Sequence, residues 1–356
     1  MRQIEVGVIG TGWCGGIRAE TLATNPLVGK LHIAETRDER LAEMAAATGA
    51  ATATKEWREL VQNPDIEAIY VCATPETTHF PMAREALLAG KHVFLEKPIA
   101  LELWEADELI ELARRRNLKF TIGYSQRFNQ KFAYAKKKLV DGTLGEPVSV
   151  LVSRHITRNL GKKISGRIKL TPAAMEATHD LDFAFWLLEP AKPIRVYAQG
   201  VNRVMHPSTG LPDIQFITVT MDNGVVVMIG AGWILPPAYP NFSHTWIEVV
   251  GSEGALMIDD THKDVALSTM GAGTVFPMST MPGERVDHVY AGSMGPETTH
   301  FLEAVVFDRP VMVTPESART VMEVYLAADI STETGEPVTL PLGNAERAKL
   351  AAGAGR

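Results

Sequence analysis

Apolar runs alternate with helical patterns along the first third of the chain. Continuous apolar segments predict strands at residues 4–9, 31–34, 68–73, 92–95 and 119–122. Between them, apolar residues spaced three or four apart predict helices near 15–24, 38–48, 77–89 and 102–116. Fully apolar strands separated by helices are typical of a parallel sheet covered on both faces. We therefore expect residues 1–123 to form an α/β Rossmann domain with a doubly wound parallel sheet.

The pattern changes after Gly123, where strands come to dominate. We expect a helix near 128–140, a strand at 147–154, a basic loop at 154–169 and a helix at 172–188. Further strands are predicted at 193–203, 214–222, 225–233, 244–250 and 255–259, and further helices near 297–307 and 315–330. Asn223-Gly224 predicts a type I′ hairpin turn. Residues 124–343 are thus expected to form an α+β domain with an open-faced, mostly antiparallel sheet, followed by a flexible tail at 344–356.

Composition narrows the classes of function that fit. The 356 residues carry a formal net charge of −7, which argues against a general affinity for nucleic acid or anionic membranes. No segment approaches the roughly 20 consecutive apolar residues of a membrane helix, and the N-terminus has no signal-peptide pattern. Two cysteines are too few for a disulfide framework or a metal cluster. We expect a cytoplasmic protein that binds a small molecule and no metal.

A glycine-rich motif indicates a dinucleotide site. Residues 10–15 read Gly-Thr-Gly-Trp-Cys-Gly, between the first strand and the first helix. Such glycines permit a tight turn and close approach to a pyrophosphate, which the helix N-terminus attracts. Glu35 follows at the end of the second strand, where a carboxylate binds ribose hydroxyls; a glycine turn with an incidental glutamate is the alternative. The cofactor-binding candidates here are Gly10, Thr11, Gly12, Trp13, Cys14, Gly15, Glu35, Thr36 and Arg37.

Glu35 also bears on which cofactor is used. Like charges at about 4 Å repel by about 4 kcal/mol at an effective dielectric of about 20. A 2′-phosphate beside Glu35 should therefore be disfavoured, although Arg37 could offset part of the repulsion by moving over the phosphate. We expect NAD, with NADP less favoured.

A lysine stands at the end of the strand predicted at 92–95, in the sequence Glu96-Lys97-Pro98. Ligands of open α/β sheets bind outside the carboxyl ends of the strands, so Lys97 can approach the atom that a nicotinamide oxidises or reduces. The alternative is a solvated loop lysine.

The helix predicted at 172–188 carries a second group of candidates. Thr171 suits its N-cap and Pro172 its first turn. An apolar stripe is expected to face the core; it comprises Ala174, Ala177, Leu181, Ala184, Phe185 and Leu188. Another face combines Met175, His179, Asp182 and Trp186. That face suits a semi-enclosed pocket; the alternative is a surface His–Asp pair.

Taken together, these motifs resemble the glucose–fructose oxidoreductase / inositol dehydrogenase / rhizopine-catabolism (Gfo/Idh/MocA) family. The resemblance covers nearly the whole chain and also rests on Ala73-Thr74-Pro75 with His79, on residues 123–128 and on residues 179–182. It implies a Rossmann domain and an open-faced sheet domain, often paired through that sheet into homodimers or homotetramers. It also implies hydride transfer between NAD(P) and a secondary alcohol or ketone of a sugar, cyclitol or related polyol.

The resemblance assigns roles to single residues. Lys97 and His179 match the catalytic lysine and histidine, and Arg127 and Asp182 match positions that meet substrate. Met175 stands where members with an Asp-x-x-x-His pattern carry a carboxylate. We also expect the cofactor to contact Ala73, Thr74, Pro75, His79, Glu96, Lys97 and Pro98.

A mechanism follows for an alcohol substrate. A neutral His179 would accept the hydroxyl proton, and Lys97 would stabilise negative charge on the same oxygen. The segment 154–169 contains seven basic or histidine residues and no acid, including Arg154, His155 and Arg158. These residues would attract a substrate carboxylate or phosphate; the alternatives are a solvated loop, cofactor phosphates or a neighbouring subunit. Two other functions remain open: an NAD-dependent redox glycosidase and a non-catalytic NAD-binding sensor.

Overall fold

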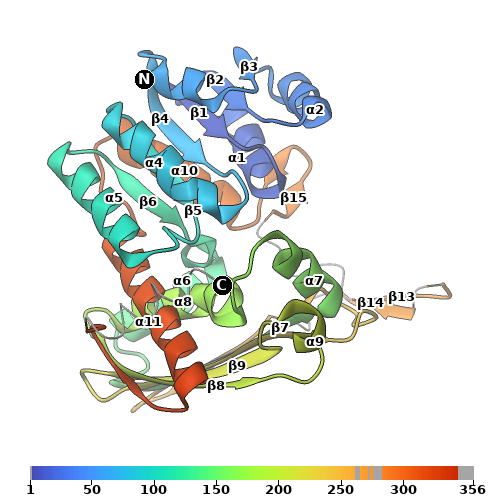
Figure 1. Ribbon diagram of the computed structural model, residues 1–356, viewed down its shortest axis with the longest axis vertical. Helices are drawn as coiled ribbons and strands as arrows, with labels where there is room; N and C mark the ends of the chain where they lie inside the picture. Colours follow the sequence, from blue (N-terminus) through green and yellow to red (C-terminus); the bar gives the residue numbers. More distant parts are fainter. Residues whose placement is uncertain (1, 261–264, 272, 276–282, 344–356) are drawn as a thin grey trace. The chain divides into compact units, whose positions relative to one another are not determined.

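The computed structural model describes residues 2–260, 265–271, 273–275 and 283–343 (Figure 1). Its contacts divide the chain into two compact units, Met1–Asn129 with Met281–Arg319 and Gln130–Thr280 with Thr320–Arg356. The sequence prediction placed 281–319 in the second domain, whereas the contacts group this segment with the first unit. The tail predicted at 344–356 lies outside the described residues.

The first unit contains a six-stranded parallel sheet in the order β3-β2-β1-β4-β5-β6. Its strands are β1 Ile4–Ile9, β2 Val28–Ala34, β3 Thr52–Thr54, β4 Ile66–Val71, β5 His92–Glu96 and β6 Phe120–Gly123. The prediction of a doubly wound parallel sheet is confirmed. Strand β3 escaped prediction because it has three residues, none of them fully buried, and so makes no apolar run.

Helices cover this sheet on both faces. Helix α1 packs with α2 and α10, while α4 packs with α5. The helical segments of this unit are α1 Trp13–Ala23, α2 Asp38–Thr48, α3 Trp57–Gln62, η1 Glu76–Thr78, α4 His79–Leu88, α5 Leu103–Arg115, η2 Ser125–Phe128 and α10 Met294–Val306. A strand pair, β15 (Arg285–Val286) with β16 (Val289–Tyr290), precedes α10.

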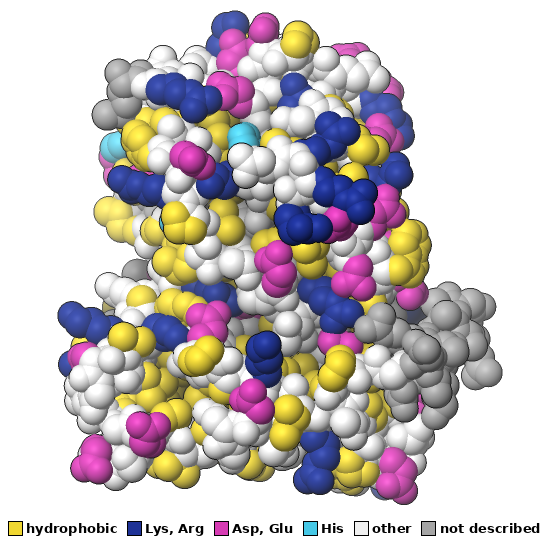
Figure 2. All heavy atoms as spheres, turned by 90° about the vertical axis from the view of Figure 1, so that its left-hand side faces the viewer, with side chains coloured by type: hydrophobic (Ala, Val, Ile, Leu, Met, Phe, Trp, Pro, Cys, Tyr) yellow, Lys and Arg dark blue, Asp and Glu magenta, His cyan; other side chains and the backbone are white. Residues whose placement is uncertain are grey.

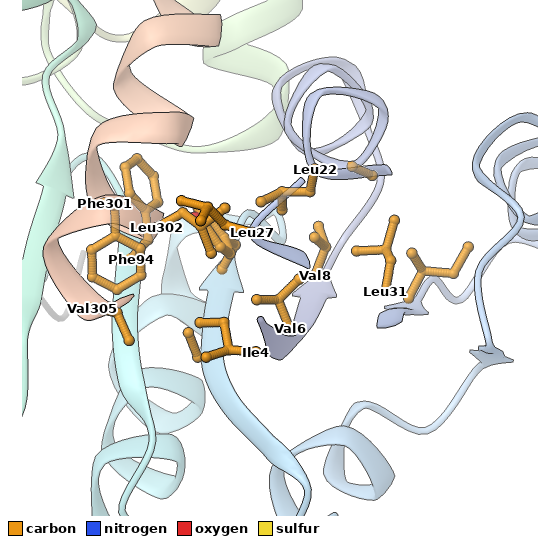
Figure 3. Packing of buried hydrophobic residues seen from close by; sticks show 14 of the residues in the cluster. Ile4, Val6, Val8, Leu22, Leu27, Leu31, Phe94, Phe301, Leu302 and Val305 are labelled. Carbon is orange, nitrogen blue, oxygen red and sulfur yellow. The ribbon is translucent and has the colours of Figure 1, made fainter. Parts of the chain in front are cut away.

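Helix α10 belongs to the core of the first unit although it lies late in the chain. Figure 3 shows Phe301, Leu302 and Val305 of α10 beside Phe94 of β5. The ring of Phe301 meets those of Tyr70 and Phe94 edge-on, at centroid distances of 5.3 and 5.9 Å. Because burying each such side chain contributes about 1.5–3 kcal/mol, this contact fixes α10 against the sheet.

The second unit contains a seven-stranded sheet in the order β12-β11-β7-β10-β9-β8-β17. Within this sheet, β7 and β10 are the only described neighbours that pair in parallel, so the prediction of a mostly antiparallel sheet is confirmed. Its strands are β7 Pro147–Thr157, β8 Pro193–Val201, β9 Ile214–Met221, β10 Val226–Leu235, β11 Ser243–Gly251, β12 Ala255–Asp259 and β17 Val338–Thr339. A separate pair comprises β13 Leu267–Thr269 and β14 Gly273–Val275.

One face of the seven-stranded sheet carries the helices of this unit (Figure 1). They are α6 Gln130–Val140, α7 Arg158–Arg167, η3 Ala173–Ala177, α8 Thr178–Leu188, α9 His206–Thr209 and most of α11 Pro315–Thr334. On the other face, Phe216, Met228 and Met257 remain 54%, 49% and 60% exposed. Among the described helices, each is too short or too polar to cross a bilayer.

The turn between β9 and β10 differs from the prediction. A type I′ turn needs positive φ at both central residues, whereas here Gly224 has φ +87° and Asn223 does not have positive φ. The Gly224 N–H donates to the Met221 carbonyl at 3.0 Å, and the Asn223 side chain accepts from the Val225 N–H. The hairpin is therefore confirmed, and the I′ assignment is wrong because the glycine alone takes the left-handed conformation.

The basic segment predicted as a loop contains helix α7. Its Leu160 and Ile164 pack against an apolar cluster that includes Met175 and Trp233. Lysines 162 and 163 and Arg167 face solvent. Two glycines inside α7 lower its helix propensity by about 1 kcal/mol each, which concealed the helix in the sequence. Gly161 is needed for packing, because a Cβ there would lie 2.5 Å from the Trp233 Cβ.

The helix predicted at 172–188 is present in two parts. It begins with the wide π-helical turn η3 and continues as α8. The Thr171 hydroxyl accepts from the Ala174 N–H at 3.3 Å, which agrees with its predicted capping role. The expected apolar stripe is buried, but burial extends around most of the helix and includes Met175 and Asp182. The unit is thus more enclosed here than a one-sided stripe predicts.

Candidate active site

The glycine motif forms a cradle at the carboxyl end of β1. Gly10 has φ +82°, and a Cβ there would lie 2.5 Å from the Ala73 Cα. A Cβ at Gly15 would lie 1.8 Å from the Gly10 carbonyl oxygen. At Gly12, by contrast, a Cβ would meet no atom within 4 Å. The first and third glycines therefore shape the loop, while the second keeps open the space that a pyrophosphate needs in front of the α1 N-terminus.

Arg40 of α2 supports this cradle from outside the motif. Its Nε donates to the Thr11 carbonyl at 2.7 Å, and its Nη2 lies where a Cβ at Gly16 would come within 2.3 Å. The guanidinium thus fills the space that a side chain at position 16 would need, and it holds the loop in place. Sequence reasoning missed Arg40 because nothing in the motif indicates which residue of the following helix reaches back.

Glu35 is placed as the motif predicts, buried next to the cradle. One carboxylate oxygen accepts from the Thr11 N–H at 3.0 Å, and the Arg37 side chain donates to both oxygens at 3.0 Å. Burial alone would raise the pKa of Glu35, but the hydrogen bonds from the Arg37 side chain and from the backbones of Arg37 and Thr11 outweigh it and lower the pKa to about 2. Glu35 is therefore charged at neutral pH. Arg37 is largely exposed, so it can leave this carboxylate when a ligand arrives.

His79 connects the two loops that follow β4 and β5. Its Nδ1 lies 2.9 Å from the Pro98 carbonyl oxygen, and its Nε2 lies 3.2 Å from that of Ala73. The side chain is 1% exposed, and burial lowers its pKa. His79 thus joins the two predicted cofactor loops from a buried position, while Thr74 and Pro75 are exposed at the surface.

Lys97 and Glu96, at the end of β5, have different surroundings. Lys97 is partly exposed at the carboxyl edge of the sheet, as predicted. Glu96 accepts at its Oε1 from the Nε of Arg18, at 2.8 Å, inside the unit.

Trp13 and Cys14 of the glycine motif differ in exposure. Trp13 is 57% exposed, whereas Cys14 is mostly enclosed, and burial raises its pKa to about 12. Cys14 is therefore a neutral thiol and not a nucleophile at physiological pH.

In the second unit, the face predicted to line a pocket is only partly accessible. His179 and Trp186 are partly exposed, whereas Met175 is 3% exposed and Asp182 is fully buried. The Lys136 ammonium lies 5.9 Å from the centre of the Trp186 ring. Solvent therefore reaches His179 and Trp186 of this face, and the other two support the helix from within.

Arg154 and His155 lie on opposite faces of the sheet. Arg154 donates from Nε and Nη2 to the buried Asp180 carboxylate at 2.8–2.9 Å. Burial alone would lower the pKa of Arg154, but the charge and hydrogen bonds of Asp180 raise it. His155 points to the open face opposite His244, and burial, aided by His244, lowers its pKa to about 4. The prediction grouped the two residues, but the two-residue period of a strand separates them, and Asp180 neutralises Arg154.

The other predicted substrate residues also make structural contacts. Arg158 donates to the Ile234 carbonyl at 3.2 Å. Arg127, in the first unit, is 2% exposed and donates to the Met312 carbonyl at 3.0 Å and to the Ser317 hydroxyl at 3.1 Å. The first bond holds the segment between α10 and α11, and the second holds the first turn of α11. Within the described ranges, no set of three or more His, Cys, Asp or Glu side chains is arranged to hold a metal ion.

Both parts of the chain match known protein families. Residues 4–124 match an oxidoreductase family with an NAD-binding Rossmann fold, and residues 132–257 match the GFO/IDH/MocA C-terminal domain. The chain is 28% identical over 335 residues to UDP-N-acetylglucosamine 3-dehydrogenase of Acidithiobacillus ferrooxidans, an alignment that covers 94% of this chain and 98% of that one. It is 26% identical over 348 residues to scyllo-inositol 2-dehydrogenase (NAD(+)) of Bacillus subtilis, with 96% and 98% covered.

A solved structure supports the fold. Scyllo-inositol dehydrogenase from Lactobacillus casei, with bound NAD(H) and scyllo-inositol, matches with a TM-score of 0.82 at 22% identity. The match covers 95% of this chain and 99% of that one. At this identity the likeness concerns the fold, which agrees with the two sheets described above.

Proposed function

The chain belongs to the GFO/IDH/MocA family of oxidoreductases, and we propose that it oxidises a ring secondary alcohol of a cyclitol or sugar with NAD as the hydride acceptor. It is an NAD-dependent oxidoreductase that acts on CH–OH groups. The observation that carries the proposal is the position of Lys97, at the carboxyl edge of the sheet that also bears the open glycine cradle. A cation at that edge can stabilise the negative charge that develops on the substrate oxygen as hydride is transferred.

The first unit has the residues that NAD requires. Gly12 leaves room before the α1 N-terminus for the pyrophosphate, and Glu35 offers a charged carboxylate for the ribose hydroxyls. When bound, NAD supplies the hydride acceptor. The protein's own residues position the alcohol, take its proton and stabilise charge on its oxygen.

His179 and Lys97 are the residues proposed for these tasks. As the alcohol carbon loses hydride, its hydroxyl must lose a proton, and a neutral His179 accepts it at an imidazole nitrogen. Lys97 donates a hydrogen bond to the same oxygen and stabilises the negative charge that develops there. The products are a ketone, reduced cofactor and a protonated imidazole, so atoms and charge balance.

An uncharged ring is the substrate class that the charges favour. Arg154, one of the predicted anion-binding residues, is already neutralised by Asp180. One relative acts on scyllo-inositol and another on UDP-N-acetylglucosamine, as their names state. In the second case the reacting group would also be a neutral ring hydroxyl, with the phosphates remote from it. The exposed lysines of α7 are available for such remote phosphates.

A substrate panel tests the proposal. Purified protein with NAD should reduce the cofactor, seen as absorbance at 340 nm, with inositols, neutral sugars or a UDP-sugar. Sugar acids serve as the matched charged set and should react at least tenfold less efficiently, because Arg154 has no spare charge for them. Activity on sugar acids alone would contradict the substrate class. Release of p-nitrophenol from glycosides without net cofactor reduction would replace the reaction by redox glycoside cleavage.

Glu35 gives a prediction about the cofactor. In Glu35→Ser the repulsion of a 2′-phosphate disappears, and Arg37 loses its carboxylate partner and can bind the phosphate. We expect the ratio of kcat/KM for NADP to that for NAD to rise at least tenfold. The double variant with Arg37→Gln is the control and should lose most of that gain. An unchanged ratio in Glu35→Ser would rule out Glu35 as the selecting residue.

The open sheet face supports a homo-oligomer. A row of side chains crosses six strands on this face and comprises Tyr197, Thr218, Met228, Leu151, Glu248 and Met257. Phe216 stands beside this row and is 54% exposed. We propose that a second copy covers it, because monomers rarely leave such apolar faces open. Phe216→Glu should then shift the mass by light scattering toward the monomer, whereas Tyr134→Glu, on helix α6, should not. A wild-type monomer would refute the pairing.

The described residues on the face seen in Figure 2 form no patch of basic side chains for a polyanion. On the face seen in Figure 2, acidic and basic side chains are interspersed and do not gather by sign. With the net charge of −7, this distribution favours a small-molecule substrate over nucleic acid.

A further inference from the structure

We propose that Arg18 and Glu297 are positioning residues for Lys97. They act through a buried ion network that fixes Glu96, the residue directly before Lys97 in the sequence. The inference rests on the role proposed above for Lys97. It assigns a function in the reaction to α10, a helix that begins at Met294, about 280 residues beyond the nucleotide motif at residues 10–15.

The network joins three elements of the first unit. Arg18 lies on α1, the helix that begins in the glycine loop, and is 1% exposed. Its Nε donates to Glu96 Oε1 at 2.8 Å, its Nη2 to Glu297 Oε2 at 2.8 Å and its Nη1 to the Thr298 hydroxyl at 2.9 Å. The guanidinium also lies 4.0 Å from the centre of the Phe94 ring. Helix α1, strand β5 and helix α10 therefore meet at one side chain.

The position of Glu96 tolerates little change. A Cβ at Gly123, the residue that pairs with Glu96 on β6, would lie 2.8 Å from Glu96 Oε2. Glycine at 123 thus leaves the room that this carboxylate occupies. The Tyr70 hydroxyl donates to the Thr298 carbonyl at 3.0 Å and so anchors α10, which carries the Arg18 partners Glu297 and Thr298. Because the Arg18 guanidinium binds the Glu96 carboxylate and Gly123 leaves little spare room around it, the peptide that leads to Lys97 is held as well.

The charges explain why the network concerns Lys97 and not only stability. One arginine faces two carboxylates, and the side chains of Glu96 and Glu297 are only 13% and 2% exposed. A buried excess of negative charge is costly unless a cation lies near. Lys97 follows Glu96 directly in the chain, so its positive charge stands next to this network. Arg18, Lys97, Glu96 and Glu297 together carry no net formal charge, and Lys97 thus offsets the formal charge of the second carboxylate.

A structural role alone is a weaker account. Replacing a buried ion network by apolar residues is often neutral or stabilising, so stability does not require one. This network ends at the residue next to Lys97, at the edge of the sheet where the ligand binds. Positioning a charged group for the transition state is a task that an apolar contact cannot perform.

Glu297→Gln tests the inference, because it keeps the shape and removes one carboxylate charge. The NAD dissociation constant, by fluorescence, and KM should stay within twofold, while kcat per NAD-binding site falls at least tenfold. Glu303→Gln, on the exposed side of the same helix, is the matched control and should keep wild-type kcat. If Glu297 had only a structural role, Glu297→Gln would lower the number of NAD-binding sites and leave the turnover of each site unchanged. That outcome would overturn the inference.

Two further variants keep the test decisive. If Glu297→Gln does not fold, Thr298→Val removes one hydrogen bond to Arg18 and should lower kcat two- to fivefold at unchanged NAD binding. Unchanged turnover in Thr298→Val would then count against the network. Lys97→Met is measured alongside: if it is inactive while Glu297→Gln is normal, only this inference fails. If Lys97→Met is active, the role proposed for Lys97 fails, and the inference fails with it.

Discussion

Lys97→Met should bind NAD as the wild type does and lose most of its turnover. Methionine has a similar length and no charge, so the loop after β5 should keep its shape while the oxygen of the alcohol loses its stabilising cation. Removing one such electrostatic donor costs about 10²–10³-fold in kcat, and we expect a loss in that range or above.

The measurement is kcat with the best substrate of the panel, together with the NAD dissociation constant. Lys119→Met is the matched control. Lys119 stands at the amino end of β6, whereas Lys97 follows the carboxyl end of β5 in the same sheet. It should change kcat less than twofold. Turnover of Lys97→Met within threefold of wild type would show that this lysine has no part in the chemistry.

His179→Ala should lose about 10²–10⁴-fold in kcat, the usual contribution of a positioned general base. The α8 backbone should be unaffected, because alanine is the best helix former. The cavity left by the ring gives a second readout: added imidazole should restore part of the rate in proportion to its unprotonated fraction.

The control for this second variant is His288→Gln, at a highly exposed position in the first unit. It should keep the wild-type rate and show no response to imidazole. A His179→Ala enzyme with near-normal turnover, or one that imidazole cannot restore while NAD still binds, would remove His179 from the role of base.

The sheet of the first unit was predictable because its strands are buried on both faces. The apolar runs of β1, β4 and β5 needed no knowledge of their neighbours. The glycine cradle was predictable because its three glycines are close together in the sequence, although Ala73 and Arg40, which also shape it, are not. Strand β3 and helix α7 were not predictable in this way, because one is short and partly exposed and the other carries two glycines.

Residues of the candidate site were predictable only where their position relative to a strand or helix of their own segment decides their role. Glu35 and Lys97 stand at strand ends, which the pattern defines. Arg18 and Glu297 are 279 positions apart, and no local pattern connects them. His155 was misplaced because the predicted loop begins inside β7, where the strand period decides which side chain faces the helices.

The ion pair between Asp180 and Arg154 was also not predictable from the sequence. Asp180 follows His179, but one residue along a helix turns the side chain by 100°, so Asp180 lies on another face. The structure uses it to neutralise Arg154. The sequence therefore suggested an anionic substrate that the paired charges do not favour.

The most direct test of hydride transfer follows a label. The protein would be incubated with NAD and the best cyclitol or sugar of the panel, carrying deuterium at the carbon that becomes the ketone. Mass spectrometry of the reduced cofactor should find one deuterium on the nicotinamide ring for each ketone formed. Deuterium released to water, with an unlabelled reduced cofactor or none, would contradict direct transfer and with it the proposed reaction.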